Sequence, residues 1–195
     1  MSFITFYNML SLLVVLPMFM QMSLLLAAFV SGLVLLPGSL LNCILAPVIG
    51  KMFDKYGPRA VITPGTILVI IGYALYASFG VDTPVWAMVC THVIWMLGVG
   101  MVLASTQTNT LNSLPREYYP DGIALTQTIQ QVAGAIGIAV MVSLLSARQA
   151  SEQAAGVALP DATASGSTLV FIVGLILAVI NFILSLFMKK PGHIK

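Results

Sequence analysis

Apolar residues along this chain are gathered into six long blocks separated by short polar segments that contain glycine or proline. Each block is long enough to cross the roughly 30 Å hydrocarbon core of a bilayer, which takes about 20 helical residues. A lipid-exposed segment must satisfy its backbone hydrogen bonds internally, so blocks of this length predict transmembrane helices. We place the spans at about residues 3–20, 28–50, 59–79, 84–106, 123–146 and 168–188.

The segments between the blocks carry the residues that usually end helices, namely glycine, proline, aspartate and serine. Two of them are a charged segment at residues 51–59 and a stretch of small residues at 147–167. We predict both as loops. Residues 1–195 then form one all-α unit, a bundle of six transmembrane helices.

Composition agrees with a membrane protein, because 59% of the residues are hydrophobic and only 7% are charged. Soluble domains carry about 25% charged residues. The net charge of +2 is small and the basic residues form no dense cluster, so no nucleic-acid partner is expected. Cys43 and Cys90 fall inside apolar blocks and are expected to pack as small hydrophobes. We expect no metal and no cofactor.

Basic residues are unevenly divided between the two sides of the predicted bundle, because one side carries only Arg148. The other side carries Lys51, Lys55, Arg59, Arg116, Lys189, Lys190 and Lys195. By the positive-inside rule, this basic side is cytoplasmic. We therefore predict a multi-pass protein of the cell membrane with both termini in the cytoplasm and segment 147–167 outside.

Apolar sequence begins within a few residues of Met1, without the polar lead that usually precedes a first span. We therefore expect the chain to be part of a longer protein or a truncated product. A genuinely short protein is the alternative.

The fifth span carries amides and small residues on a shared face, because Gln127, Gln131 and Gly134 follow helical spacing. Ala133 and Gly137 are a small-xxx-small pair of the kind that lets two helices approach closely. Helix packing accounts for the small residues. For the glutamines two interpretations stay open, namely hydrogen bonding between helices and the lining of a cavity.

Other spans also contain polar residues. In the second span Asn42 shares a face with Ser39 and Gly50, and nearby prolines allow that helix to bend. In the fourth span His92 is a candidate functional group, because ionisable residues inside a membrane are costly. All six acidic residues fall in loops or at helix ends, so a proton-coupling group is not expected on this chain unless His92 takes that role.

The charged segment carries a recognisable spacing in Gly50, Asp54, Lys55, Gly57 and Arg59. Gly57 permits a left-handed turn, Pro58 suits the first position of a helix, and the acid lies near that helix's positive end, where the bases can pair with it. An ordinary charged cytoplasmic turn is the simpler interpretation. The spacing nevertheless resembles the cytoplasmic loop of the major facilitator superfamily, where it acts as a gate.

Two further stretches, residues 35–38 and 124–139, make the chain similar to the last six helices of the fourteen-helix drug:proton antiporter-2 family. The resemblance implies a C-terminal half-bundle built from two inverted three-helix repeats. It also implies export of lipophilic, often cationic, drug-like molecules in exchange for protons, with the cavity completed by an N-terminal half or a partner chain. Lys55 departs from the more usual arginine of the motif, which keeps the charge but loses bidentate pairing.

The leading hypothesis is thus one half of a multidrug efflux transporter, embedded in the lipid bilayer. Its expected cavity residues are Asn8, Asn42, His92, Gln127 and Gln131. The alternative is a structural or regulatory membrane protein that transports nothing and associates with a full-length partner. An enzyme is not expected, since no catalytic arrangement of histidine, acid or nucleophile appears in the sequence.

Overall fold

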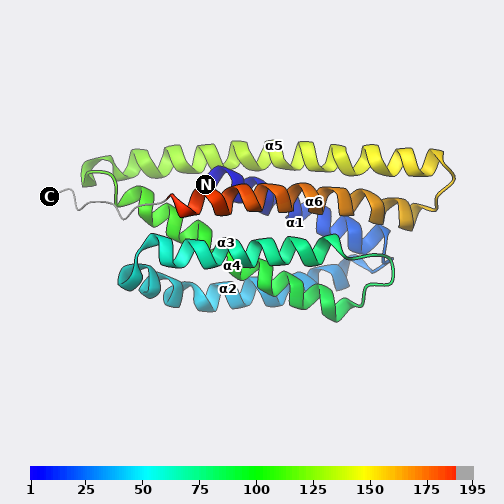
Figure 1. Cartoon of the computed structure of the whole chain (residues 1–195), viewed down its shortest axis with the longest axis horizontal. Helices are drawn as coiled ribbons and strands as arrows, with labels where there is room; N and C mark the ends of the chain where they lie inside the picture. Colours follow the sequence, from blue (N-terminus) through cyan, green and yellow to red (C-terminus); the bar gives the residue numbers. More distant parts are fainter. Residues whose placement is uncertain (188–195) are drawn as a thin grey trace.

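The computed structural model describes residues 1–187 and shows an all-helical chain (Figure 1). Six long helices are joined by short turns, and a single 3-10 turn, η1, precedes the fifth. The helices are α1 (Ser2–Met22), α2 (Ala28–Tyr56), α3 (Pro58–Ala77), α4 (Val85–Leu111), α5 (Tyr119–Ala154) and α6 (Leu159–Leu186), with η1 at Arg116–Tyr118. All six are long and apolar enough to cross a membrane, which confirms the predicted all-α architecture.

Successive helices run in opposite directions along the long axis of the bundle (Figure 1). The starts of α1, α3 and α5 therefore share one end with the last turns of α2, α4 and α6. We call this the near end, because it carries the charged segment, and the opposite one the far end. Lys189, Lys190, Lys195 and the last predicted residue of the sixth span lie outside the described residues.

Both predicted loops are largely helical. Helix α2 continues to Tyr56, so only Gly57 separates it from α3, and Gly57 adopts the expected positive φ of 85° before Pro58 at the start of α3. Helix α5 runs to Ala154 and α6 starts at Leu159, which leaves four residues, 155–158, as the turn. The predicted loop at 147–167 was wrong because it was inferred from polarity. Ala, Arg, Gln and Glu in residues 147–154 are good helix formers, so the helix continues outside the apolar block.

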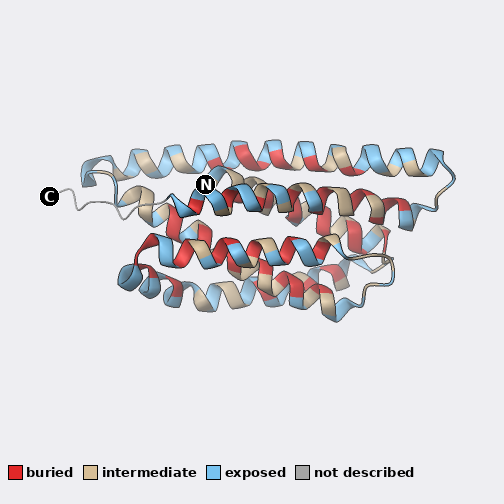
Figure 2. Ribbon diagram, in the orientation of Figure 1, coloured by how far each residue is buried: buried red, intermediate tan, exposed pale blue. Residues whose placement is uncertain are grey.

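The two halves of the chain interlock, because α1 packs on α5, and α2 packs on α4. Helix α3 completes the bundle by packing on both α4 and α6. Buried residues follow the inward sides of the helices, while the side of α5 that faces away from the bundle is exposed (Figure 2). The core at the centre is partly aromatic and includes Phe19, Tyr73, Tyr76, Trp95 and Phe171.

Helices α3 and α4 are in close backbone contact along a seam of glycines. A Cβ atom on Gly98 would lie 2.6 Å from the carbonyl oxygen of Gly65, and one on Gly72 would lie 2.6 Å from Cβ of Trp95. Neither distance is possible for real carbon atoms without a shift of the helices. The absence of side chains at these positions is therefore what sets the spacing between α3 and α4.

Candidate functional site

The glutamines of α5 divide between two environments. Gln130 is buried, with 8% of its surface exposed, whereas Gln127 and Gln131 are both exposed on the outer side of the helix. Gln131 lies three turns into α5, so its amide is well inside the length of the helix. The exposed amides leave α5 with a polar strip that no other part of the described chain covers.

The small residues of α5 lie against α1. Ala133 is fully buried, and a Cβ on Gly137 would lie 2.7 Å from the carbonyl oxygen of Tyr7. Gly134 is held in the same way against the side chain of Leu10. These three positions let α1 and α5 approach closely, and Gln127 and Gln131, on the neighbouring face of α5, are thereby turned outward.

Asn8 lies inside the bundle and not on an open surface, unlike the cavity position expected for it. Its side-chain nitrogen donates to the carbonyl oxygen of Gly174 at 3.4 Å, and the hydroxyl of Tyr73 donates to the backbone carbonyl of Asn8 at 3.1 Å. One turn away, the amide of Asn181 donates to the Thr5 hydroxyl at 2.7 Å. The α1–α6 contact is therefore a polar seam, and Asn8 holds it together.

His92 is likewise buried, with 4% of its surface exposed, between α2, α3 and α4. Its Nδ1 lies 3.2 Å from the hydroxyl of Tyr76, and its ring stacks on Trp95 with centroids 5.9 Å apart. Gly38 of α2 covers it, since a Cβ there would lie 2.7 Å from the imidazole Cδ2. His92 was expected to line a cavity, but the neighbouring helices cover it in this structure.

Asn42 is half-buried on α2 and lies against α4. Its side chain occupies the space that a Cβ on Gly100 would take, with the amide nitrogen 2.8 Å from that position. Of the five residues expected to line a cavity, Asn42, Gln127 and Gln131 thus remain accessible, while Asn8 and His92 do not. The structure does not bring the five together into one pocket.

The charged segment forms the last turns of α2 at the near end. Asp54 is exposed and, within residues 1–187, forms no ion pair with Lys55 or Arg59, and no side chain caps the first turn of α3. Because residues 51–56 are helical, neighbouring side chains point in different directions and the expected pairing fails. Asp54 instead lies at a hollow of about 370 Å³ between α2 and α4, together with Ser105 and Thr108.

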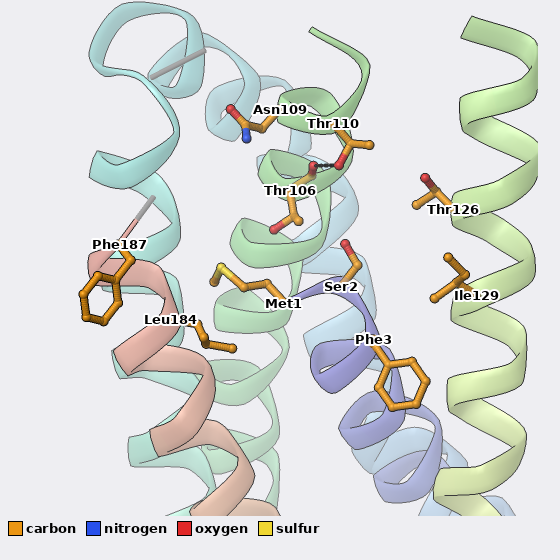
Figure 3. Close-up of a pocket in the computed structure, with 10 residues that line it drawn as sticks. All are labelled: Met1, Ser2, Phe3, Thr106, Asn109, Thr110, Thr126, Ile129, Leu184 and Phe187. Atoms are coloured by element: carbon orange, nitrogen blue, oxygen red, sulfur yellow. Dashed lines mark hydrogen bonds between the residues drawn. The ribbon is translucent and has the colours of Figure 1, made fainter. Parts of the chain in front are cut away.

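A larger hollow opens at the near end, with a volume of about 520 Å³ (Figure 3). Four helices contribute to its wall, namely the first turns of α1, the last turns of α4, the first turns of α5 and the end of α6. The lining residues are Met1, Ser2, Phe3, Thr106, Asn109, Thr110, Thr126, Ile129, Leu184 and Phe187. Hydroxyl and amide groups thus alternate with apolar side chains, and no charged side chain is among them.

Thr106, Asn109 and Thr110 were not among the expected site residues. Asn109 and Thr110 follow Thr106 by three and four residues, so the three side chains share one face of α4. This helical spacing is the feature of the sequence that could have identified them. The Oδ1 atom of Asn109 is buried without a hydrogen-bond partner in the described chain, whereas the Thr110 hydroxyl donates to the Thr106 carbonyl at 2.9 Å.

The hollow is suited to a neutral or weakly polar amphiphile. Volumes of 300–1,000 Å³ are typical of small-molecule sites. Ser2, Thr110 and Thr126 offer hydroxyl groups to a ligand, while Phe3, Ile129 and Leu184 provide apolar contact (Figure 3). Within residues 1–187, no group of three or more His, Cys, Asp or Glu side chains is placed to hold a metal ion.

Six membrane-length helices, a hollow of mixed polarity lined by four of them and a polar strip left open on α5 are together typical of an integral membrane protein of the transporter class. The chain belongs to the Major Facilitator Superfamily, whose family model matches residues 1–138. The fold agrees, because the inward-open xylose transporter XylE from E. coli superposes with a TM-score of 0.70 at 15% identity. That match covers 97% of this chain and 46% of XylE, so it confirms the expected half-bundle of the superfamily.

Sequence relatives include proteins named for drug resistance. The lincomycin resistance protein LmrB of Listeria monocytogenes is 44% identical over 193 residues, which is 96% of this chain and 41% of that protein. The LmrB protein of Bacillus subtilis is 40% identical over 196 residues, which is 97% of this chain and 41% of that protein. The chain therefore spans about two fifths of the length of these relatives.

Proposed function

We propose that this chain is the C-terminal half of a proton-coupled multidrug exporter of the drug:proton antiporter-2 type. In this proposal it transports only together with a second six-helix unit, which supplies the other wall of the substrate path. The two units rock against each other so that the path opens to one side of the membrane at a time.

The polar strip of α5 carries this proposal. An amide exposed to hydrocarbon loses its hydrogen bonds to water, which costs several kcal/mol, so polar side chains in membrane helices face protein or a water-filled space. Gln127 and Gln131 are exposed in the isolated bundle. A second unit packed beside α5, with a hydrated path between the two, removes that cost.

The large hollow supports a drug-like substrate. Its wall combines hydroxyl and amide groups with phenylalanine, leucine and isoleucine, which suits a molecule that is apolar but carries several polar groups. The names of the relatives indicate lincomycin as a first substrate to test. Cationic compounds bind here only if the partner unit supplies the negative charge, because the described wall has none.

The near end faces the cytoplasm in this proposal, since Lys51, Lys55, Arg59 and Arg116 all lie there and Arg148 lies at the far end. Asp54 is exposed and unpaired within the described chain, so it is free to contact the partner unit and stabilise one state of the gate. The proton-coupling acid belongs to the partner, because the six acids of this chain lie near helix ends or in turns.

Efflux from energised cells tests the proposal. Cells expressing this chain alone are expected to retain ethidium and lincomycin, whereas cells that also express the portion of the Listeria relative beyond the matched region are expected to export them. A protonophore should abolish that export. Asp54→Asn, in the co-expressing cells, should slow efflux without lowering the amount of protein in the membrane.

Export by the chain alone would contradict the half-transporter proposal. No export in either strain, with both proteins present in the membrane, would favour the structural or regulatory alternative. Arg116→Gln is a suitable control for Asp54→Asn, because it alters one exposed charge at the same end without touching the charged segment.

Accessibility of the α5 strip gives a second prediction. In a variant with Cys43 and Cys90 replaced by serine, Gln131→Cys is expected to react quickly with a membrane-impermeant maleimide once the partner unit is present. Gln130→Cys is the matched control, because it lies one residue away and only 8% of Gln130 is exposed. Equal rates at the two positions would show that Gln131 does not line a hydrated path.

A further inference from the structure

The far end carries a small polar cluster where α5 and α6 meet. Arg148 is half-exposed, and its Nη2 donates to Glu152 Oε1 at 2.6 Å while its Nε donates to Ser165 Oγ at 3.1 Å. Ser165 in turn donates to Glu152 Oε1 at 3.2 Å. A guanidinium has five N–H donors, so this network fixes the orientation of Arg148 and leaves several donors free.

Beside this network lies a hollow of about 360 Å³, lined by Arg148, Ser165, Thr168, Leu169 and Ile172. Glu152 is not part of its wall. The hollow is therefore lined by a guanidinium, two hydroxyl groups and two aliphatic side chains. The Thr168 hydroxyl donates to the Ala164 carbonyl at 3.0 Å and the Ser165 hydroxyl to Glu152, so the free donors are those of Arg148. A guanidinium with free N–H groups is a typical ligand of a phosphate group.

The depth of the hollow in the membrane follows from α6. Every exposed residue of α6 from Ile172 to the end of the described chain is apolar: Ile172, Ile176, Val179, Ile180, Ile183, Leu184, Leu186 and Phe187. This face spans roughly 23 Å, which is most of the hydrocarbon thickness, and its composition is that of a lipid-facing surface. Arg148 and Thr168 lie just beyond its far end, where we place the boundary between hydrocarbon and headgroups.

We infer that this hollow binds a phospholipid, with the headgroup phosphate on the free N–H groups of Arg148 and an acyl chain along Leu169, Ile172 and Ile176. The juxtaposition is the basis of the inference: an oriented guanidinium with free N–H groups lines the same hollow as Ile172, the first residue of a continuous apolar strip. The site does not include the α5 glutamines, and the inference does not depend on the transport proposal. A bound lipid here joins the far ends of α5 and α6.

Native mass spectrometry of the purified chain in detergent tests the inference. Phosphatidylglycerol is expected to remain bound at concentrations where diacylglycerol with the same acyl chains, which lacks the phosphate, does not. Arg148→Gln should weaken phosphatidylglycerol binding by roughly fivefold or more, since it removes the charge-assisted bonds. Arg116→Gln removes the same charge from an exposed residue at the near end and should leave binding unchanged.

Further variants test the other contacts of the hollow. Thr168→Val keeps the shape of the side chain and should leave binding unchanged, because the Thr168 hydroxyl already donates to the Ala164 carbonyl. Ile172→Ala should weaken binding, whereas Ile183→Ala, at 49% exposure on the same face but distant from the hollow, should not. Equal retention of phosphatidylglycerol and diacylglycerol, or unchanged binding in Arg148→Gln, would overturn the inference. Thermal unfolding without added lipid verifies that each variant is folded.

Discussion

Gly98→Ala is expected to lower the free energy of unfolding by about 2 kcal/mol, the range found for overpacked cores. The new methyl group would lie 2.6 Å from the carbonyl oxygen of Gly65 and 2.8 Å from the backbone nitrogen of Val69. Both are backbone atoms, so no side chain can rotate away and α3 and α4 must separate. Reversible unfolding in mixed micelles, followed by tryptophan fluorescence of the buried Trp95, measures the loss.

Gly32→Ala is the matched control for this prediction. Gly32 is also within a helix, but a Cβ there meets no atom within 4 Å. The substitution should stabilise α2 by up to about 1 kcal/mol, because alanine has the higher helix propensity. Similar stability of the two variants would show that the α3–α4 seam has room for a methyl group, and that close backbone contact does not hold these helices.

Thr126→Trp is expected to reduce drug efflux by roughly tenfold or more in cells that also supply the partner unit, which corresponds to about 1.4 kcal/mol. The Thr126 side chain faces the large hollow from α5, opposite the polar face of α4 (Figure 3). An indole at this position fills the space between α4, α5 and α1 in which a substrate would lie. Initial rates of ethidium and lincomycin efflux, corrected for protein in the membrane, measure the effect.

Thr128→Trp provides the comparison, since Thr128 is exposed on the same helix and does not line the hollow. Its efflux should stay close to that of the unaltered chain. If both tryptophans reduce efflux equally, the effect belongs to α5 as a whole and not to the hollow. If neither does, the substrate path lies elsewhere, and the Asn42 face of α2 becomes the next position to test.

Much of the fold is predictable because it depends on local sequence. The length of an apolar block determines whether a helix can span a bilayer, and Gly57-Pro58 determines where α2 ends and α3 begins. The helix ends beyond the membrane were less predictable. Residues 147–154 are polar and were assigned to a loop, but polarity shows only that a segment leaves the lipid and not that its helix ends there.

The candidate site was predictable only in part. Polar positions such as Asn8, His92 and Gln131 stand out in an apolar span, but the same residue types serve packing and transport alike. Asn8 became a hydrogen-bonded link between α1 and α6, and His92 a partner of Tyr76, because their surroundings are set by other helices and not by their own spans. The threonine and asparagine face of α4 was visible in the sequence as a helical spacing.

The sequence by itself determined the class of the protein, its six helices and the turn at the charged segment, since hydropathy, length and turn chemistry act within a few residues. Only the tertiary structure decided that Gln130 faces inward while Gln127 and Gln131 stay open, and that four helix ends enclose a hollow. The physical reason is that a residue's surroundings depend on which helices pack beside it, and glycine contacts between distant segments determine that packing.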